Sequence, residues 1–374
     1  MKKRILALFL LVVLAFSLVA CGGDPVDTNT GSDSSLPASS NNSDVSSNTD
    51  NSDSGDEVNK GYDETMEHKI IISDREAHKI LVMDLNACNG DFEALPDSDS
   101  AIVWEYDLAN DPNRKTRDAG AGLDSAKYRY SPYYGKDVVI ACSSDGWAGV
   151  VDYEAKTLLW ESDAPVLHNA HSIEMLPNGD VVVAVAKDTD DAGLVYFPLS
   201  AGVNTYSSAI PSKYSHGVCW DPENEWLWVL ENTETVAIKV NGMGTEDAKL
   251  VRLSGLGAQS QGGGGGHAFA PVGGQPGKYW ASFGGKVYQF DSVEEEMIPD
   301  AYFSSRDTKG ICSFSDGTVV QIVADEDTVV SSDIHIVIRK LSGGKKQELR
   351  NVETVVNFPG MVFYKVQAFT KDYQ

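Results

Sequence analysis

HSIEMLPNGDVVVAVA, from His171 to Ala186, is the pattern that the folded part of the chain repeats. It begins with a short, mostly apolar segment, residues 171–175. Pro177–Asp180 follows and contains the Asn-Gly pair favoured in two-residue hairpin turns, where both central residues need a positive φ. Val181–Ala186 is then an unbroken run of β-forming residues that is too short for a typical buried helix. The stretch therefore predicts a β-hairpin whose second strand is buried on both faces.

Units of the same kind recur four more times. Aligning Lys127, His171, His216, His267 and Lys309 gives spacings of 44, 45, 51 and 42 residues, by subtraction of the residue numbers. Each of these anchors precedes a turn-forming cluster, a β-run and a third strand, and some units show a fourth strand. Four short strands in about 45 residues, without helical periodicity, are typical of a β-propeller blade.

The two ends of the folded part supply the pieces of one more blade. Lys69–Asp107 contains three predicted strands with no anchor strand before them, and Met361–Thr370 is one strand with no blade after it. Pairing the two segments closes the ring and hides both sheet edges. The sequence thus predicts an all-β, six-bladed propeller of four-stranded antiparallel blades over residues 68–374. A seventh blade would need a repeat that the sequence does not contain.

The N-terminus carries the features of an exported, lipidated protein. Basic residues 2–4 precede the apolar segment Ile5–Val19, which is shorter than a membrane span. The sequence Leu-Val-Ala-Cys-Gly around Cys21 resembles the lipobox of bacterial lipoproteins, whose cysteine is lipidated. We interpret residues 1–20 as a signal peptide and residues 21–67, rich in Ser, Asp and Asn, as a disordered tether. This predicts extracytoplasmic anchoring in the cell membrane; the alternative is an ordinary secretory signal with a chance cysteine.

The net charge limits which molecules the protein can bind electrostatically, and the cysteines limit its disulfides and metal sites. The formal net charge is −25, and about −28 without the three basic residues of the signal. So acidic a surface argues against nucleic acid or anionic lipid as an electrostatic partner. Cys88, Cys142, Cys219 and Cys312 permit two disulfides, but three of them lie in apolar strand-like runs. We favour buried free thiols, and the absence of a Cys-x-x-Cys pair disfavours a cysteine zinc site.

Two features resemble known families. Trp104-Glu105 and Trp160-Glu161 end two outer strands alike and are similar to the Trp-bearing outer strands of quinoprotein-like propellers. The lipobox, the tether and a propeller containing HSIE-x-LPNG together resemble a family of bacterial lipoproteins of unknown function, over most of Lys69–Gln374. The resemblance implies the fold and carries no established activity.

Three histidines occupy the same position in successive units. In a propeller, the first strand of each blade lines the central channel, so His171, His216 and His267 should converge at one mouth. Neutral imidazoles there could hold a divalent metal such as Zn, Mn, Fe or Ni, with a position left open for substrate. The alternative is structural: each histidine hydrogen-bonds the backbone of a neighbouring blade.

Lysines occupy the remaining anchors, Lys127, Lys309 and Lys365. Three cations facing three histidines predict a positive pocket suited to a carboxylate or sulfate group. The alternative is that these lysines point into solvent at the mouth.

Loops between the second and third strands should share that mouth. Their polar or aromatic candidates for ligand contacts are Asp74, Arg75, Asp145, Trp147, Asp188 and Glu231. Trp147, in Ser-Asp-Gly-Trp, is the most suggestive, because an aromatic ring at a loop tip can stack on a sugar ring.

The expected function is binding. We expect a monomeric, surface-anchored lipoprotein whose channel mouth takes a carbohydrate or another acidic small molecule. One alternative is a lyase or hydrolase in which a metal polarises the carboxylate of an acidic sugar while a histidine or lysine removes a proton. Another is a protein-binding scaffold. No catalytic residue stands out.

Overall fold

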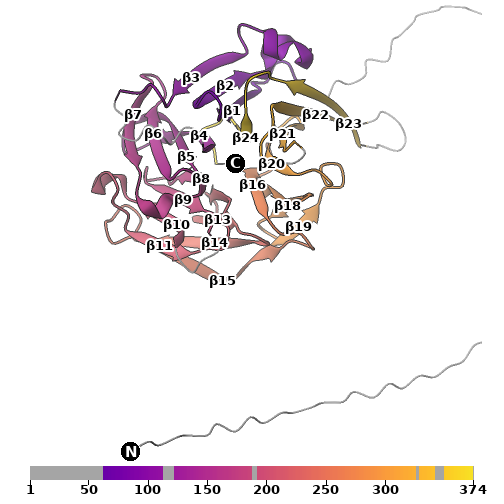
Figure 1. Cartoon of the computed structure of the whole chain (residues 1–374). Helices are drawn as coiled ribbons and strands as arrows, with labels where there is room; N and C mark the ends of the chain where they lie inside the picture. Colours follow the sequence, from indigo (N-terminus) through magenta and orange to yellow (C-terminus); the bar gives the residue numbers. More distant parts are fainter. Residues whose placement is uncertain (1–61, 113–121, 188–191, 326–327, 342–348, 374) are drawn as a thin grey trace, which may run out of the picture. The chain divides into compact units, whose positions relative to one another are not determined.

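The computed structural model describes residues 62–112, 122–187, 192–325, 328–341 and 349–373. These residues form six four-stranded antiparallel sheets arranged as blades around a central channel (Figure 1). The inner strands of neighbouring blades contact one another around the axis, from β4 through β8, β12, β16 and β20 to β24 and back to β4. The predicted all-β six-bladed propeller is confirmed.

The first three blades follow one pattern from the channel outward. Blade 1 consists of β24 (Phe363–Ala368), β1 (Lys69–Asp74), β2 (Lys79–Asp84) and β3 (Ile102–Asp107). Blade 2 consists of β4 (Leu123–Ser131), β5 (Lys136–Ser143), β6 (Trp147–Asp152) and β7 (Thr157–Ser162). Blade 3 consists of β8 (Ala170–Met175), β9 (Val181–Val185), β10 (Ala192–Phe197) and β11 (Ser208–Pro211).

The other three blades complete the ring. Blade 4 consists of β12 (Gly217–Asp221), β13 (Trp226–Leu230), β14 (Glu234–Asn241) and β15 (Lys249–Gln259). Blade 5 consists of β16 (Gly266–Pro271), β17 (Lys278–Phe283), β18 (Lys286–Asp291) and β19 (Glu296–Pro299). Blade 6 consists of β20 (Thr308–Ser313), β21 (Thr318–Val323), β22 (Asp333–Leu341) and β23 (Leu349–Asn357). Short 3-10 helices lie at Leu85–Cys88 (η1), Phe92–Asp97 (η2), Pro165–Leu167 (η4) and Leu199–Ala201 (η5).

Strand β9 shows why the second strands are continuously apolar. All five of its residues are fully buried. Val181, Val183 and Val185 pack with blade 2, whereas Val182 and Ala184 pack with blade 4. Each blade thus has a blade on both of its faces, and a strand buried on both faces needs no polar residue in its alternation.

The turn between β8 and β9 differs from the prediction. Gly179 has a φ of +94°, but Asn178 is not among the described non-glycine residues with positive φ. Leu176 N donates to Asp180 O at 2.7 Å, and Gly179 N donates to Leu176 O at 2.8 Å, so the loop has three residues. The predicted two-residue turn is wrong because Pro177 fixes φ near −65°, which suits the first central position of a type I turn followed by a glycine bulge.

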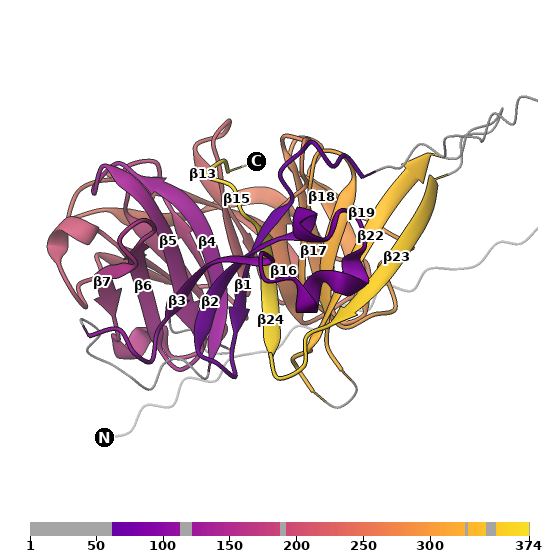
Figure 2. The same ribbon diagram turned by 90° about the horizontal axis from the view of Figure 1, so that it is seen from above.

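Blade 1 closes the ring as predicted. Strand β24 pairs antiparallel with β1, with Ile70 opposite Ala368 and Ile72 opposite Val366. Figure 2 shows the last strand of the chain lying beside the first described one. The inner edge of β1 is therefore covered by the C-terminal end of the chain.

The signal peptide, Cys21 and the tether up to residue 61 lie outside the described residues. Tyr62, expected to belong to the tether, is buried, and its ring stacks on His68 at a centroid distance of 4.2 Å. Ordered contacts therefore begin before residue 68. In the part of the chain that the structure describes, no helix is long and apolar enough to span a membrane. Cys88, Cys142, Cys219 and Cys312 are free thiols, as favoured from the sequence.

Candidate functional site

Inner strands β4, β8 and β20 each carry a bulge near one end of the channel, whereas β12 pairs with β13 without a shift in register. The pairing register shifts between Leu123 and Ser125 in β4, between Ala170 and Ser172 in β8, and between Thr308 and Gly310 in β20. One extra residue on the inner strand stands at each shift, and a bulge of this kind redirects its side chain. We call the residues of this level the histidine layer; they are Asp124, His171, His216, His267 and Lys309.

The three histidines do come together, as predicted. The rings of His171 and His216 stack with centroids 4.3 Å apart and planes at 22°, and the ring of His267 meets His216 edge-on at 5.1 Å. In the stack, ring faces rather than nitrogen atoms face each other. Among the described residues, no group of three His, Cys, Asp or Glu side chains is arranged to hold a metal ion. The divalent metal stays a prediction.

Each imidazole has a protein partner. His171 Nε2 lies 3.1 Å from Asn169 Oδ1, and His216 Nδ1 lies 2.9 Å from Tyr214 O. His267 Nε2 accepts from Lys309 Nζ of the next blade at 2.9 Å. Burial lowers the pKa of His171 and His216 well below the ordinary value and that of His267 to about 3. The imidazoles are therefore neutral, and they join the blades around the axis.

Asp124 is the member of this layer that the sequence alignment missed. Its Oδ1 accepts from Arg75 Nη2 at 2.5 Å. Its Oδ2 lies 3.3 Å from His171 Nδ1, and neither atom has a hydrogen-bond partner among the described residues. Burial raises the pKa of Asp124 to about 7, against the lowering effect of Arg75. Two orphaned buried polar atoms face each other here.

The three lysines do not form one pocket. Lys309 contacts His267 and pairs with Asp307 at 2.9 Å. Lys365 crosses the channel and donates to the carbonyl oxygens of His171, at 2.8 Å, and His216. Lys127 follows Asp124, the bulged residue of β4, by three positions. It therefore lies further along the channel than the histidine layer. The predicted alignment of Lys127 with the histidines is therefore out of register.

Of the predicted loop residues, Arg75 reaches the histidine layer. Asp74, Asp145 and Glu231 have structural partners: they accept from Val362 N, Gly122 N and the Arg252 guanidinium, respectively. Asp188 lies outside the described residues.

Trp147 is not at a loop tip. It is the first residue of β6 and is fully buried, with Nε1 donating to Glu161 Oε2 at 3.1 Å. The turn ends one residue earlier, at Gly146, which has a φ of +93°. The ring therefore packs inside the blade and presents no face to a ligand.

A buried ion triad lies below the histidine layer. Lys127 Nζ donates to Glu174 Oε2 at 2.9 Å and to Val218 O at 2.6 Å. Arg129 binds the same carboxylate, with Nε 2.8 Å from Oε1 and Nη2 3.1 Å from Oε2. All three side chains are at most 5 % exposed. One carboxylate is thus shared by two cations, and charges this deeply buried are stabilised by partners of this kind.

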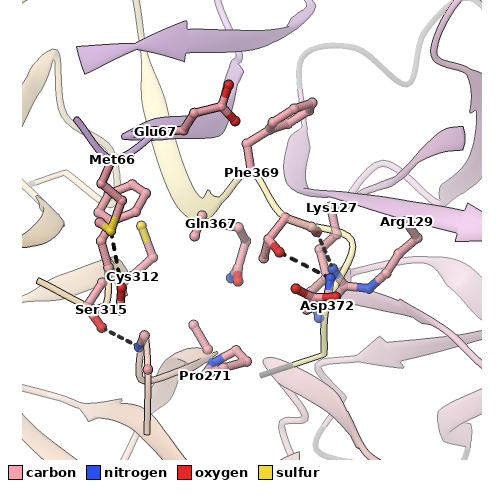
Figure 3. Close-up of a pocket in the computed structure, with 17 residues that line it drawn as sticks. Met66, Glu67, Lys127, Arg129, Pro271, Cys312, Ser315, Gln367, Phe369 and Asp372 are labelled. Atoms are coloured by element: carbon pink, nitrogen blue, oxygen red, sulfur yellow. Dashed lines mark hydrogen bonds between the residues drawn. The ribbon is translucent and has the colours of Figure 1, made fainter. Parts of the chain in front are cut away.

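Lys127 and Arg129 of the triad line one wall of a cavity of about 270 Å³ at the end of the channel opposite the histidine layer. We call this cavity the chamber. In Figure 3, Gln367 of β24 lies between the wall of Met66 and Cys312 and the wall of Lys127 and Arg129. The Gln367 side chain makes no hydrogen bond to another described residue, so its amide is available to a ligand. No motif in the sequence pointed to this end of the channel.

The C-terminal strap, residues 370–373, covers the chamber, and Figure 1 shows the end of the chain over the centre of the ring. Arg129 Nη1 donates to Thr370 O at 3.1 Å, and the Arg129 guanidinium lies 5.0 Å from the centre of the Tyr373 ring. Lys371 Nζ pairs with Asp137 Oδ2 of blade 2 at 2.8 Å. The last residues before the strap, such as Phe369, also line the chamber.

Part of the chain matches the model of a known protein family. Residues 124–331 match DUF6528, described as a family of unknown function, over 208 of 374 residues (331 − 124 + 1). No curated protein matches the chain. Among solved structures, a functionally unknown protein from Desulfotomaculum acetoxidans DSM 771 is 10 % identical, with 78 % of this chain and 80 % of that chain covered and a TM-score of 0.46. The β-propeller domain of Cps50 (Swd1) from Myceliophteria thermophila is 10 % identical, with 63 % and 72 % covered and a TM-score of 0.41.

Proposed function

The chain belongs to the DUF6528 family, a family of unknown function, and we propose that it is a lipid-anchored extracytoplasmic protein that binds a small carboxylate-bearing sugar in the chamber. The chamber replaces the histidine layer as the expected ligand site. The histidine layer is occupied by its own stacked rings and by Lys365, whereas the chamber is a cavity with polar groups facing into it.

The charge balance of the chamber wall carries the proposal. Lys127 and Arg129 share the single carboxylate of Glu174, so the triad carries one positive charge in excess. Both cations also donate to backbone carbonyl groups. The carboxylates of Glu67 and Asp372 line the same cavity, and among the described contacts neither pairs with Lys127 or Arg129. Backbone dipoles stabilise a cation less well than an opposite charge does. A ligand carboxylate in the chamber would meet this excess charge, and the low polarity of the site would strengthen their attraction.

Size and lining favour a single sugar ring. The volume of about 270 Å³ lies just below the range of about 300–1,000 Å³ typical of small-molecule sites. Phe314 and Phe369 offer apolar surface to the face of a ring, and the Gln367 amide and the Ser313 hydroxyl line the same cavity. Apolar walls with a few convergent polar groups are the usual composition of a ligand site.

Calorimetric titration tests the proposal. We expect galacturonate and glucuronate to bind and their neutral counterparts, galactose and glucose, to bind at least about tenfold more weakly. Lys127→Met should abolish this preference while the protein stays folded, because Glu174 keeps both bonds to Arg129. Lys309→Met is the matched control: it removes a buried lysine of the histidine layer and should leave uronate binding unchanged.

The outcomes are separable. Equal affinity for charged and neutral sugars, or no binding of either, would refute the carboxylate assignment. Loss of binding in Lys309→Met but not in Lys127→Met would return the ligand to the histidine layer. Following the absorbance of unsaturated uronates during the same incubations tests the lyase alternative.

The anchoring part of the proposal is supported by the N-terminal sequence. Basic residues 2–4, the apolar segment Ile5–Val19 and the Leu-Val-Ala-Cys-Gly sequence at Cys21 stand in the order of a lipoprotein signal. The polar segment that follows is long enough to hold the propeller away from a membrane.

A further inference from the structure

The C-terminal strap crosses the chamber from blade 2 to blades 3 and 4. At its root, the ring of Phe369 stacks on the ring of Tyr128 in β4, with centroids 4.1 Å apart. At its far end, Tyr373 packs against the apolar core shared by blades 3 and 4. Between the two, Thr370 and Asp372 line the chamber. A molecule that enters the chamber on this side must therefore pass the strap.

Few interactions hold the strap in place. The backbone pairing of β24 with β1 ends before it, where Phe369 N donates to Lys69 O at 2.8 Å. Among the described residues, no backbone hydrogen bond joins residues 370–373 to another strand of the propeller. The side chain of Lys371 pairs with Asp137 but is 47 % exposed, and ion pairs this exposed contribute little to stability. The strap can therefore detach by a hinge directly after Phe369 while β24 stays in its sheet.

Arg129 connects the strap with the ion triad. Its guanidinium carries five N–H groups. Nε and Nη2 bind Glu174, and Nη1 donates to the carbonyl oxygens of Tyr128, at 2.8 Å, and Thr370, at 3.1 Å. A carboxylate that binds the remaining end of the guanidinium through two bonds needs one N–H from each of Nη1 and Nη2. Such a ligand must therefore displace one of the two carbonyl groups from Nη1.

Thr370 is the partner that can leave, because Tyr128 lies within strand β4. Opening of the strap frees Nη1 for the carboxylate of a ligand. It also takes the carboxylate of Asp372 away from the cavity, where Figure 3 shows it on the same side as Lys127 and Arg129. Like charges in one cavity repel each other, so the closed strap and a bound carboxylate disfavour each other.

We infer that the strap is an autoinhibitory lid: while it is closed, Thr370 O occupies the place of the ligand carboxylate on Arg129, and the ligand binds after the strap has swung away. The inference rests on the proposed function, because it takes the ligand of the chamber to carry a carboxylate. The apparent affinity is then the affinity of the open form reduced by the fraction of molecules in which the strap is open.

Cys312 can report the opening of the strap in the absence of a ligand. It is a free thiol that lines the chamber and is 1 % exposed, so iodoacetamide reaches it when the chamber opens. If opening and closing are faster than the reaction, the labelling rate follows the fraction of open molecules. Cys142 is also a buried free thiol but does not line the chamber, so its labelling reports unfolding of the propeller. Mass spectrometry of the labelled peptides distinguishes the two cysteines.

Removal of residues 370–374 tests the inference. Because a hydrogen bond to a charged group is lost, we expect Cys312 to be labelled at least about tenfold faster. Galacturonate should bind more tightly by the same factor. Lys371→Met should raise both quantities by a smaller, shared factor of up to about fivefold. Lys136→Met is the matched control and should change neither, because Lys136 is 45 % exposed and pairs with Asp152 within blade 2.

The results separate the lid from the proposed function. Unchanged labelling and unchanged galacturonate affinity in the truncated protein would overturn the lid and leave carboxylate binding standing. Faster labelling of Cys312 without galacturonate binding in any variant would refute the proposed ligand and keep the strap as the lid of the chamber. Faster labelling with unchanged affinity would overturn the competition for Arg129. Equal effects of Lys371→Met and Lys136→Met, or a parallel rise in the labelling of Cys142, would also overturn the lid.

Discussion

Replacing Glu174 by Gln should destabilise the protein more than any other change in the ion triad. The substitution keeps the shape of the side chain and removes its charge. Lys127 and Arg129 then remain as two buried cations without a carboxylate, and their side chains are only 1 % and 5 % exposed. Removing one partner of a buried ion pair costs about 3–5 kcal/mol, because the charge left behind has no compensation.

The unequal sharing of Glu174 makes a matched comparison possible. Lys127→Met leaves Glu174 with Arg129 Nε at 2.8 Å and Nη2 at 3.1 Å, which is a balanced pair. We therefore expect Lys127→Met to cost only about 1–2 kcal/mol, mainly from the hydrogen bonds that Lys127 donates. The arrangement predicts a clear order: Glu174→Gln is the more damaging of the two.

Thermal and urea unfolding of the two variants measure this difference. At about 2 °C per kcal/mol for a domain larger than 150 residues, Glu174→Gln should lower Tm by about 6–10 °C. A loss below 1 kcal/mol in Glu174→Gln, or a larger loss in Lys127→Met, would refute the picture of one carboxylate that stabilises two buried cations.

Three further outcomes follow from other parts of the molecule. Truncation after Asn357 removes β24 and uncovers the inner edge of β1, so the shortened protein should unfold or aggregate in light scattering; an unchanged melting transition would contradict ring closure. Bonds from Arg306 lower the pKa of Glu353 from its ordinary 4.5 to about 2, so its stabilising contribution is complete above pH 4.5 and lost as the pH falls to 2. The difference in Tm between wild type and Glu353→Gln should accordingly become smaller as the pH falls over that range. A constant difference would contradict the lowered pKa of Glu353. Cys21→Ser should leave the membrane fraction and lose labelling by radioactive palmitate, whereas a labelled, membrane-bound variant would exclude the anchor.

Much of the propeller could be predicted because the stacking of blades imposes a recurring apolar pattern on the sequence. A second strand such as β9 is apolar at every residue since both of its faces are buried, and this run recurs with each blade. The closing strand was recognisable because it lacked a blade of its own. These signals are local or periodic, so no knowledge of the three-dimensional arrangement is needed to find them.

The register of the inner strands could not be predicted in the same way. In blade 2, Asp124, Lys127 and Arg129 are all polar, and only the bulge in the pairing with β5 shows that Asp124 is the residue level with the histidines. A bulge adds one residue to one strand and leaves no pattern in composition. Taking Lys127 as the residue equivalent to His171 shifts the alignment of blade 2 by three residues, because the bulge lies at Asp124.

Neither the burial of Trp147 nor the position of the chamber was predicted from the sequence, and the reasons differ. Ser-Asp-Gly-Trp resembles a loop tip, but the ring folds back over Gly149, where a Cβ would lie 2.2 Å from its Cζ2. That glycine is a local signal that could have been used. The chamber brings together β4, β20, β24 and the strap. Lys127 and Gln367 are 240 residues apart (367 − 127), and no spacing rule relates them.

The pairing of β24 with β1 also determines how fast the protein can fold. Ile70 and Ala368 are 298 residues apart (368 − 70), whereas the longest connection between the other neighbouring strands of a blade, residues 85–101, has 17 residues (101 − 85 + 1). Bringing together ends so distant costs about 3 kcal/mol more in chain entropy than closing a ten-residue loop, from the logarithmic dependence on loop length. Folding should therefore be slow, with blade 1 assembled last, because it needs both β1 and β24. Unfolding of the ring requires β24 to separate from β1. We therefore expect the rate of this separation to set the lifetime of the folded ring.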